Sequence, residues 1–211
     1  MTMATISTSN AQATADPRIR RSEAAIQQAL LERLAAGRPF DALTVSEVAE
    51  HAGVTRKTFY ARFGSLEQVV QRRLEALLQD IATHIDDDML VFSRSNHSLA
   101  LLVFQAYEAH WAALAPFIRH CPAGLFTDPV TGVAATLLDR LVEINRVPPL
   151  PEGDKAYLVA LVASAVHGVL SAWARRDFAE PAEQVALLVD AVLLPGVRGV
   201  LTRADRQTAT T

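Results

Sequence analysis

Apolar residues recur every three or four positions along most of the chain, the spacing that places them on one face of an α-helix. The alternation of apolar and polar residues that marks a half-buried strand is nearly absent. The pattern therefore predicts an all-α protein. The predicted helices cover residues 17–37, 44–53, 55–64, 65–84, 96–120, 128–146, 154–176 and 181–194. The fifth of them could be interrupted before Pro116.

The short helices at 44–53 and 55–64 are separated by a single tight corner. Thr44 and Glu47 have the spacing of a capping box, which satisfies free amides at the start of a helix. Ser65 and Gln68 have the same spacing at the start of the long fourth helix. Gly53 lies where the chain must reverse between the two short helices, a step that favours a positive φ and hence glycine. These signals predict a helix-turn-helix.

The second helix of this pair is predicted to expose a partly basic face. When Phe59 faces inward on a helical wheel, Phe63 lies on the same side and Lys57 points away. Arg56 and Lys57 lie in the first turn, where either side chain could donate a hydrogen bond to guanine in a major groove. Exposed hydroxyls and the free amides of a helix start suit phosphate oxygens. The candidate DNA-binding residues are Thr44, Thr55, Arg56, Lys57, Thr58 and Tyr60.

Charge is distributed unevenly along the chain, whose net charge is −3. Residues 18–73 hold ten Arg or Lys and six Asp or Glu, a net charge of +4. From residue 74 onward there are ten basic and sixteen acidic residues, a net charge of −6. A helix-turn-helix can serve only for packing between helices, but the positive charge of this region favours an approach to a polyanion such as DNA.

Residues 44–65, TVSEVAEHAGVTRKTFYARFGS, resemble the DNA-binding signature of the TetR family of bacterial transcriptional regulators. The resemblance covers residues 18–70, and the remainder is similar to the family in architecture only. It implies an N-terminal three-helix DNA-binding domain followed by a helical domain for ligand binding and dimerisation. The predicted division is a disordered tail at 1–16, the helix-turn-helix domain at 17–64, the ligand-binding and dimerisation domain at 65–201 and a C-terminal tail at 202–211.

One position departs from the family pattern. Members commonly carry a lysine at the start of the fourth helix that is thought to contact DNA, whereas this chain has Leu66 there. The resemblance therefore implies no phosphate contact from this position. The basic residues that could compensate are Arg18, Arg20, Arg21 and Arg62.

The middle helices contain a cluster of aromatic residues with a few polar tips. A cavity lined by such residues would suit a mainly hydrophobic small molecule oriented by one or two hydrogen bonds. Many of the same residues are equally compatible with an ordinary hydrophobic core. The candidate ligand-binding residues are Phe104, Tyr107, His110, Trp111, Phe117, His120, Phe126 and His167.

The last two predicted helices are rich in small apolar residues, which allow helices to approach closely. They fit a four-helix bundle built from two helices of each copy in a homodimer, and the alternative is packing within one chain. The small residues in question are Ala160, Ala163, Ala165, Gly168, Ala172, Ala186, Val189 and Val192. Residues 156–173 are about long enough to span a membrane, but the polar His167 and the charged flanking segments favour a helix buried among protein helices.

Other classes of protein are disfavoured by what the chain contains. Cys121 is the only cysteine, so an internal disulfide cannot form, and residues 1–15 lack the features of a secretion signal; we therefore expect a cytoplasmic protein. No nucleophile elbow, phosphate-binding loop or dinucleotide fingerprint occurs, so we expect no catalysis and no cofactor. His84 and Asp88 could share a metal ion, but a solvated helix end explains them better, so no metal site is predicted.

Together these features predict a homodimeric, ligand-responsive DNA-binding regulator. We expect a repressor that leaves a palindromic double-stranded operator when a mainly hydrophobic small molecule binds. Two alternatives remain open: a helical small-molecule-binding protein with weakened or lost DNA binding, as Leu66 suggests, and an all-α enzyme that uses scattered histidines.

Overall fold

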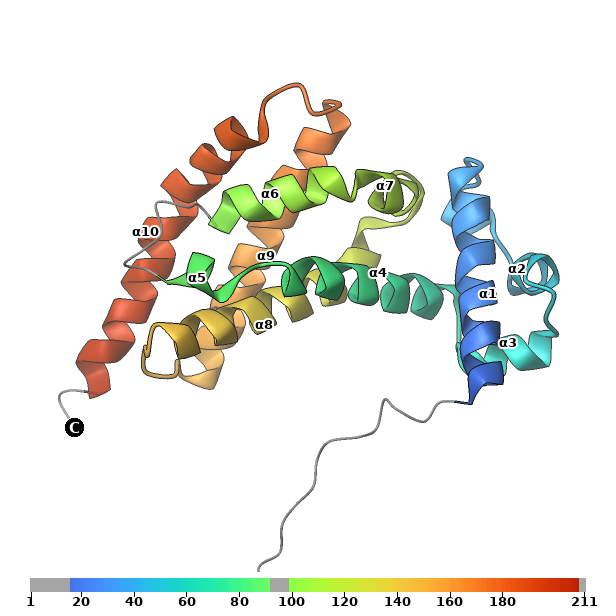
Figure 1. The fold of residues 1–211 in the computed structure, drawn as a ribbon, viewed down its shortest axis with the longest axis horizontal. Helices are drawn as coiled ribbons and strands as arrows, with labels where there is room; N and C mark the ends of the chain where they lie inside the picture. Colours follow the sequence, from blue (N-terminus) through green and yellow to red (C-terminus); the bar gives the residue numbers. More distant parts are fainter. Residues whose placement is uncertain (1–15, 92–98, 209–211) are drawn as a thin grey trace, which may run out of the picture.

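The computed structural model describes residues 16–91 and 99–208, and within these residues every regular element is helical (Figure 1). The predicted N-terminal tail therefore lies outside the described residues except for Asp16. The all-α prediction is confirmed. The elements are α1 (Pro17–Ala35), η1 (Phe40–Ala42), α2 (Val45–His51), α3 (Arg56–Arg62), α4 (Leu66–Thr83), α5 (Asp87–Leu90), α6 (Leu99–Ala109), α7 (Trp111–His120), η2 (Ala123–Phe126), α8 (Thr127–Ile144), α9 (Glu152–Arg175) and α10 (Ala182–Thr208).

Helices α1 to α3 form a separate body at one end of the molecule, in blue and cyan in Figure 1. Their apolar faces meet in one small core, which the start of α4 completes. The fully buried side chains of this core are Ile26, Leu30, Leu34, Val48, Phe59, Phe63, Val69 and Val70. Because these side chains are buried and packed in one cluster, the three helices hold one another in fixed positions.

Hydrogen bonds local in sequence set the ends of these helices. Thr44 and Glu47 form the predicted capping box: the Thr44 amide donates to the Glu47 carboxylate at 3.0 Å, and the Glu47 amide donates to the Thr44 hydroxyl at 3.2 Å. Gly53 has a φ of +65°, and the amides of Gly53 and Val54 close α2 on the carbonyls of Glu50 and Ala49. This is a Schellman motif, and it creates the tight corner before α3.

The second predicted capping box forms only in part. The Gln68 amide donates to the Ser65 hydroxyl at 3.4 Å, so Ser65 caps α4 as expected. The Gln68 side chain, however, accepts from the amide of Gly64 at 2.9 Å rather than from Ser65. The predicted hydrogen bond from the Ser65 amide to the Gln68 side chain is therefore wrong, because the chain before Ser65 brings the Gly64 amide closer to Gln68.

Helix α4 connects the amino-terminal body to the rest of the molecule (Figure 1). Its first turns pack on α1, and its later turns pack on α8. At its far end, Arg140 of α8 donates to the carbonyls of Ala82 at 3.0 Å and Ile85 at 2.7 Å. A second link between the two parts is the contact of α7 with α1. Movement within the larger body can therefore reach the smaller one by two routes.

In the larger body, α6 packs on α10, and α8 lies between α4 and α9. The predicted helix at 96–120 is broken at His110 rather than before Pro116, and Pro116 lies inside α7. The final helix was predicted to end near Leu194, but α10 continues through Pro195 to Thr208. Leu201, beyond that proline, is 2% exposed, so packing supports the extension.

Helices α9 and α10 are long and apolar. By length and composition alone, Glu152–Arg175 and Ala182–Leu201 could each cross a membrane. In the fold they belong to the larger body: α9 contacts α6, α8 and α10, and α10 also contacts α6. The prediction of a helix buried among protein helices is confirmed in part, since 28% of the apolar stretch of α9 is buried.

Candidate functional sites: a basic helix and an apolar cavity

Helix α3 presents polar side chains outward from a buried anchor. Phe59 is fully buried and packs against Phe63, with 6.2 Å between ring centroids, whereas Tyr60 on the outer side is 51% exposed. The Thr55 hydroxyl caps the helix by accepting from the Thr58 amide at 3.1 Å. The position of this short helix is therefore set by its buried aromatic residues and its cap.

The first turn of α3 carries two exposed cations. Arg56 and Lys57 are both exposed, and neither has a hydrogen bond or an ion pair with any residue that the structure describes. Thr44, at the start of α2, is exposed as well. The residues predicted to contact DNA thus lie at or near the outer surface of the helix-turn-helix, and their cationic groups are available to a partner.

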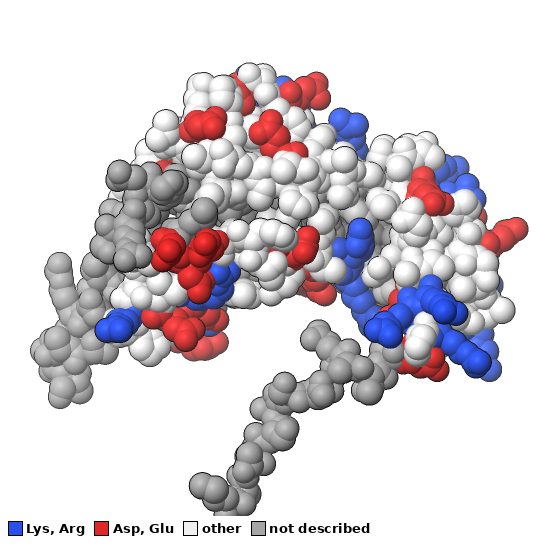
Figure 2. Space-filling view, viewed as in Figure 1, with Lys and Arg blue, Asp and Glu red and all other residues white. Residues whose placement is uncertain are grey.

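Further basic residues surround this helix. Arg18, Arg20 and Arg21 are exposed at the start of α1, and Figure 2 shows basic side chains gathered at this end of the molecule. Arg62 is held within the domain, because its guanidinium donates to the Ser22 hydroxyl at 3.1 Å. Leu66 is 7% exposed and packs into the core. Of the residues considered as compensation for Leu66, the three arginines of α1 are therefore the better placed.

Polar contacts fix α2 against α1. His51 of α2 and Glu32 of α1 are joined by a contact of 2.7 Å between Nε2 and the carboxylate. Hydrogen bonds from Gln28 and then His51 lower the pKa of the Glu32 carboxyl. These groups are at the surface, so their role is to orient the two helices rather than to supply much stability.

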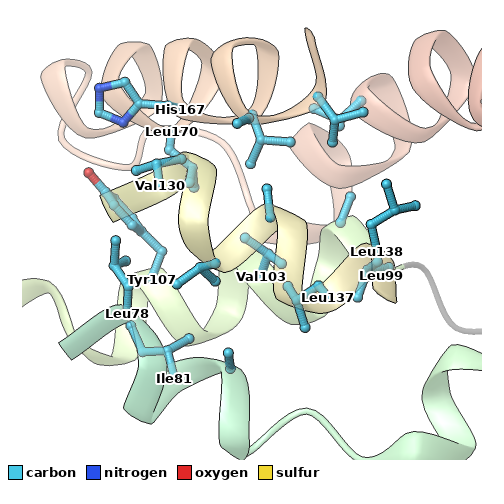
Figure 3. A pocket seen from close by; sticks show the side chains of 18 of the residues that line it. Leu78, Ile81, Leu99, Val103, Tyr107, Val130, Leu137, Leu138, His167 and Leu170 are labelled. Carbon is cyan, nitrogen blue, oxygen red and sulfur yellow. The ribbon is translucent and has the colours of Figure 1, made fainter. Parts of the chain in front are cut away.

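A cavity of about 230 Å³ lies in the larger body, among α4, α6, α8, α9 and α10 (Figure 3). Its walls consist almost entirely of aliphatic side chains. These include Leu74, Leu78 and Ile81 of α4, Val103 of α6, Val130, Leu137, Leu138 and Leu141 of α8, Val162, Val166 and Leu170 of α9, and Leu193 of α10. Such a cavity suits an apolar small molecule.

Three of the predicted ligand-binding residues line this cavity: Tyr107, Phe126 and His167. The other five, Phe104, His110, Trp111, Phe117 and His120, lie outside its lining. Sequence reasoning favoured aromatic residues and missed the aliphatic walls. The apolar residues of α8 recur at helical spacing, and this pattern could have indicated that α8 lines a cavity. The same pattern is also typical of a helix that packs in a closed core.

Two of the aromatic residues outside the lining, Phe104 and Trp111, belong to an aromatic cluster with Trp173 and Phe178. Phe178 contacts both tryptophans, with centroid distances of 5.1 Å to Trp111 and 4.7 Å to Trp173. Phe104 packs on Trp173 at 5.5 Å. Phe178 has a positive φ of 56°, an unusual conformation for a bulky residue, and the amides of Asp177 and Phe178 close α9 in a Schellman motif. The cluster thus fixes the turn between α9 and α10.

Two polar side chains of the lining, Tyr107 and His167, lie at one end of the view in Figure 3. The Tyr107 hydroxyl is buried and has no hydrogen-bond partner among the residues described, and burial raises its pKa to about 12. The His167 ring stacks on Phe126, with 5.4 Å between centroids, and burial lowers the pKa of its imidazole. Both groups are therefore neutral near pH 7.

A second apolar surface lies on the outside of α9 and α10. Large hydrophobic side chains are exposed there: Tyr157 (78%) and Leu161 (60%) on α9, and Leu187 (68%), Leu188 (63%) and Val192 (68%) on α10. We call these five residues the α9/α10 face. Ala160 and Gly168 are exposed as well, whereas Ala163, Ala186 and Val189 are buried inside the chain. Some of the small residues noted in the sequence are therefore exposed, as a dimer interface requires, and others are buried, as packing within one chain requires.

The described residues contain no group of three or more histidine, cysteine or acidic side chains that could hold a metal ion. His84 and Asp88 do not share a helix, because α4 ends at Thr83 and Asp88 belongs to α5. The His84 imidazole instead contacts the Asp80 carbonyl at 2.7 Å.

Comparison with known proteins identifies the amino-terminal region. Residues 30–72 match the family described as "Bacterial regulatory proteins, tetR family". This segment runs from the middle of α1, through the helix-turn-helix, into α4. A search of curated proteins gives no match.

Most of the chain can be superposed on solved structures of regulators. The dihydroxyacetone kinase operon activator DhaS superposes with a TM-score of 0.51 at 14% identity, over 85% of this chain and 98% of that one. The fatty acid degradation regulator FadR from Bacillus halodurans gives 0.47 at 19% identity, over 88% and 98%. The TetR family repressor AlkX from Dietzia gives 0.43 at 20% identity, over 85% and 96%. The likeness to DhaS shows that the arrangement of both bodies is a known one.

Proposed function

We propose that the chain is a ligand-responsive regulator of transcription of the tetR family, whose model residues 30–72 match. In this proposal two copies bind a palindromic operator, and a mainly hydrophobic small molecule in the cavity releases the DNA. The observation that carries the proposal is that one helix, α4, joins an exposed basic recognition helix to an apolar cavity. We propose a cytoplasmic location, where operator DNA is accessible.

DNA contacts are assigned to the outer side of α3. Arg56 and Lys57 lie in the first turn, the part of a recognition helix that meets base edges, and both are exposed and unpaired among the described residues. Tyr60 and the threonines at the helix starts are proposed to bind phosphates. The arginines at the start of α1 add positive charge at the same end of the molecule. They are proposed to supply the phosphate contact that Leu66 cannot make.

The α9/α10 face is proposed to form the homodimer interface. Its leucine, valine and tyrosine side chains form a larger exposed apolar surface than is usual on a soluble monomer. Packing against the same face of a second copy removes this apolar area from water. Two helices from each copy would form a four-helix bundle. The dimer would present two recognition helices to successive major grooves, about 34–36 Å apart.

Ligand binding is proposed to act through α4. Four cavity-lining residues, Leu74, Leu78, Ile81 and Ala82, belong to α4, and the same helix supports the helix-turn-helix with Val69 and Val70. A ligand that displaces α4, or shifts α7 where it contacts α1, changes the separation of the two recognition helices. Because such coupling is reciprocal, operator DNA is expected to weaken ligand binding by the same factor, typically ~5–150-fold.

Repression is proposed as the mode of regulation, since a regulator that leaves DNA on binding its ligand can block transcription when the ligand is absent. DhaS, which shares the fold, is described as an operon activator, so activation is compatible with this architecture. A reporter gene placed behind the selected operator distinguishes the two. Repression predicts higher expression when the gene for this protein is deleted, and activation predicts lower expression.

The proposal is tested by selecting DNA from a random pool with the full chain and measuring affinity by fluorescence anisotropy. The selected sequences are expected to be palindromic, with half-site centres about 10 base pairs or a multiple of that apart. Affinity is expected to fall about 10³–10⁵-fold between 50 and 200 mM salt if 6–10 phosphates are contacted. Binding that does not depend on salt, or a failure to select any sequence, would contradict the proposal.

One observation favours a second candidate function, a small-molecule-binding protein that has lost specific DNA binding. Leu66 is buried at the position where members commonly carry lysine, so that contact is missing. In this case the double variant Lys57→Ala, Tyr60→Ala would bind DNA as the unaltered chain does. A clear loss of affinity in the double variant supports the regulator instead.

A further inference from the structure

The apolar cavity offers a bound molecule almost no hydrogen-bonding group. Among the described residues of its lining, only three carry a polar side chain: Tyr107, His167 and Asp190. The Tyr107 oxygen is buried with almost no accessible surface, and in Figure 3 the hydroxyl is directed away from the aliphatic walls. It therefore cannot reach a molecule that occupies the cavity.

The other two polar residues do not supply a partner inside the cavity. The His167 ring stacks on Phe126, with 5.4 Å between centroids, and its Nε2 atom lies 3.5 Å from the Ser171 hydroxyl on the same helix. In Figure 3 this ring lies beyond the aliphatic walls. Asp190 is only partly buried, so water screens its carboxylate, and its charge disfavours an anion. No lysine or arginine occurs among the described lining residues.

The walls and the size of the cavity are typical of a site for hydrocarbons. An apolar cavity of about 150 Å³ lined by leucine, isoleucine and phenylalanine stays dry and binds benzene. The cavity of this chain, of about 230 Å³, is larger, and its walls consist mainly of leucine and valine. Because such walls form no hydrogen bonds with water, a hydrocarbon that enters gains dispersion contacts without displacing strongly held water.

A polar atom on the bound molecule would lose its hydrogen bonds to water and gain none from the walls. Burying a hydroxyl without a partner lowers affinity by roughly 5–150-fold, and burying an unpaired carboxylate or ammonium group lowers it further. The cavity is therefore able to distinguish a hydrocarbon from the alcohol and the carboxylic acid that oxidation of the same chain would give.

We propose that the cavity selects hydrocarbons that lack a hydrogen-bonding group, and that a molecule of this class is the effector. This rests on the proposed function, in which the cavity is the effector site. Affinity comes from dispersion contacts with the aliphatic walls and from the removal of the hydrocarbon's surface from water. Alcohols and carboxylates of the same chain length are poor effectors, because the walls cannot replace water as their hydrogen-bond partner.

The test compares octane with three eight-carbon molecules that carry one polar end: 1-octanol, octanoate and octylammonium. Gas chromatography of the vapour above a solution of the full chain at pH 8 measures free octane. Each polar probe is then added as a competitor, below the concentration at which it forms micelles, and the octane that returns to the vapour gives its affinity. Octane is expected to bind, 1-octanol at least about fivefold more weakly, and each ion at least about tenfold more weakly.

Two matched variants show whether octane binds in this cavity. Ala134→Leu enlarges a side chain of the wall and is expected to weaken octane, whereas Ala112→Leu makes the same change at an exposed position of α7 outside the lining and should leave octane binding unaltered. Equal affinities of the two variants would overturn the inference. The competition series uses the unaltered chain, so it decides the question even if Ala134→Leu does not fold.

Three further results would overturn the inference. These are octane that does not bind, 1-octanol that competes within about fivefold of octane, and an ion that competes within about tenfold. The last two would mean that a protein group reaches the polar end of the probe or that this end stays in water.

The DNA-release measurement separates this inference from the proposed function. If the probes bind in the expected order but octane leaves the selected operator bound, the selectivity of the cavity stands and regulation by this cavity fails. If octane does not bind, the assignment of the cavity to hydrocarbons is overturned, while salt-sensitive binding of the operator is unaffected.

Discussion

Helices α4 and α8 have the same length but very different surroundings. Of the 18 residues of α4, seven are buried, and those of its first turns complete the core of the DNA-binding domain. Of the 18 residues of α8, all of them described, only Pro129 is buried, although the helix carries a strong apolar stripe. Much of that stripe borders the cavity instead of a closed core.

The same difference separates the two domains. The DNA-binding domain covers its apolar side chains with its own residues, such as Phe59 and Phe63, and its turns use glycine where φ is positive. The second domain leaves apolar surface uncovered in two places, the cavity and the α9/α10 face. Exposed apolar area is unfavourable in water, which is why we propose that a ligand and a second copy cover these two surfaces. The comparison predicts that the two domains respond in opposite ways to the same kinds of substitution.

The largest expected effect comes from placing charge on the α9/α10 face. The double variant Leu188→Glu, Val192→Glu puts two carboxylates where the second copy is proposed to pack, so it is expected to yield a monomer. Losing the second recognition helix removes avidity, and affinity for a palindromic operator should fall about 10²–10⁴-fold. Size-exclusion chromatography with light scattering and anisotropy measure the two effects.

Ala112→Glu, at an exposed position of α7 outside that face, controls for added charge and is expected to remain dimeric. A double variant that stays dimeric would show that the face is not the interface.

The two lysines of the chain offer a matched test of the charge difference between the domains. Lys57→Ala removes a proposed base contact and should weaken the selected operator by about 1–3 kcal/mol per half-site. Lys155→Ala removes only a surface ion pair with Asp139, of 2.7 Å, and should leave DNA affinity unchanged. Equal effects of the two substitutions would mean that Lys57 acts only through net charge.

Adding bulk to an alanine should have opposite effects in a closed core and at the wall of the cavity. Ala49 is 1% exposed in a closed core, so Ala49→Leu is expected to destabilise the protein by about 1–3 kcal/mol through overpacking. Ala134 lines the cavity, so Ala134→Leu is expected to stabilise the ligand-free protein by about 0.5–2 kcal/mol and to weaken the binding of a small apolar probe such as octane. Thermal unfolding midpoints give the signs, and a destabilising Ala134→Leu would mean that the cavity walls cannot accept more volume.

The smallest expected effects concern two glycines that have nothing within 4 Å of where a Cβ would lie. At Gly53 the backbone has a φ of +65°, so Gly53→Ala should destabilise the DNA-binding domain by about 1–2 kcal/mol. Gly132 lies within α8 at an exposed position, so Gly132→Ala should stabilise the protein by about 0.5–1 kcal/mol. Because neither alanine meets a neighbour, the same sign at both sites would contradict the backbone explanation.

The DNA-binding domain could be predicted closely, because its signals act over a few residues. The capping pair Thr44 and Glu47 and the reversal at Gly53 fix α2 and α3 to within two residues of the predicted spans. The exposed side of α3 follows from the helical period once Phe59 is placed inward. None of these inferences needs knowledge of residues distant in sequence.

Helix limits in the second domain were harder to predict because packing overrides local preference there. Pro116 and Pro195 both indicate helix ends, yet both lie inside helices, since an internal proline removes one backbone hydrogen bond that neighbouring contacts can offset. The break occurs instead at His110, beside Trp111, whose ring packs against Phe178 from a turn much later in the chain. No signal near His110 reveals that contact.

The sequence by itself determined that the chain is helical, that its first third is basic and that a helix-turn-helix exposes Arg56 and Lys57. Only the tertiary structure decided which apolar residues border a cavity and which close a core. An apolar stripe records that a helix face avoids water, but the distance between two such faces depends on helices that are far apart in sequence. For this reason Tyr107, Phe126 and His167 could be proposed from sequence as ligand-binding residues, while the aliphatic walls around them became visible only in the fold.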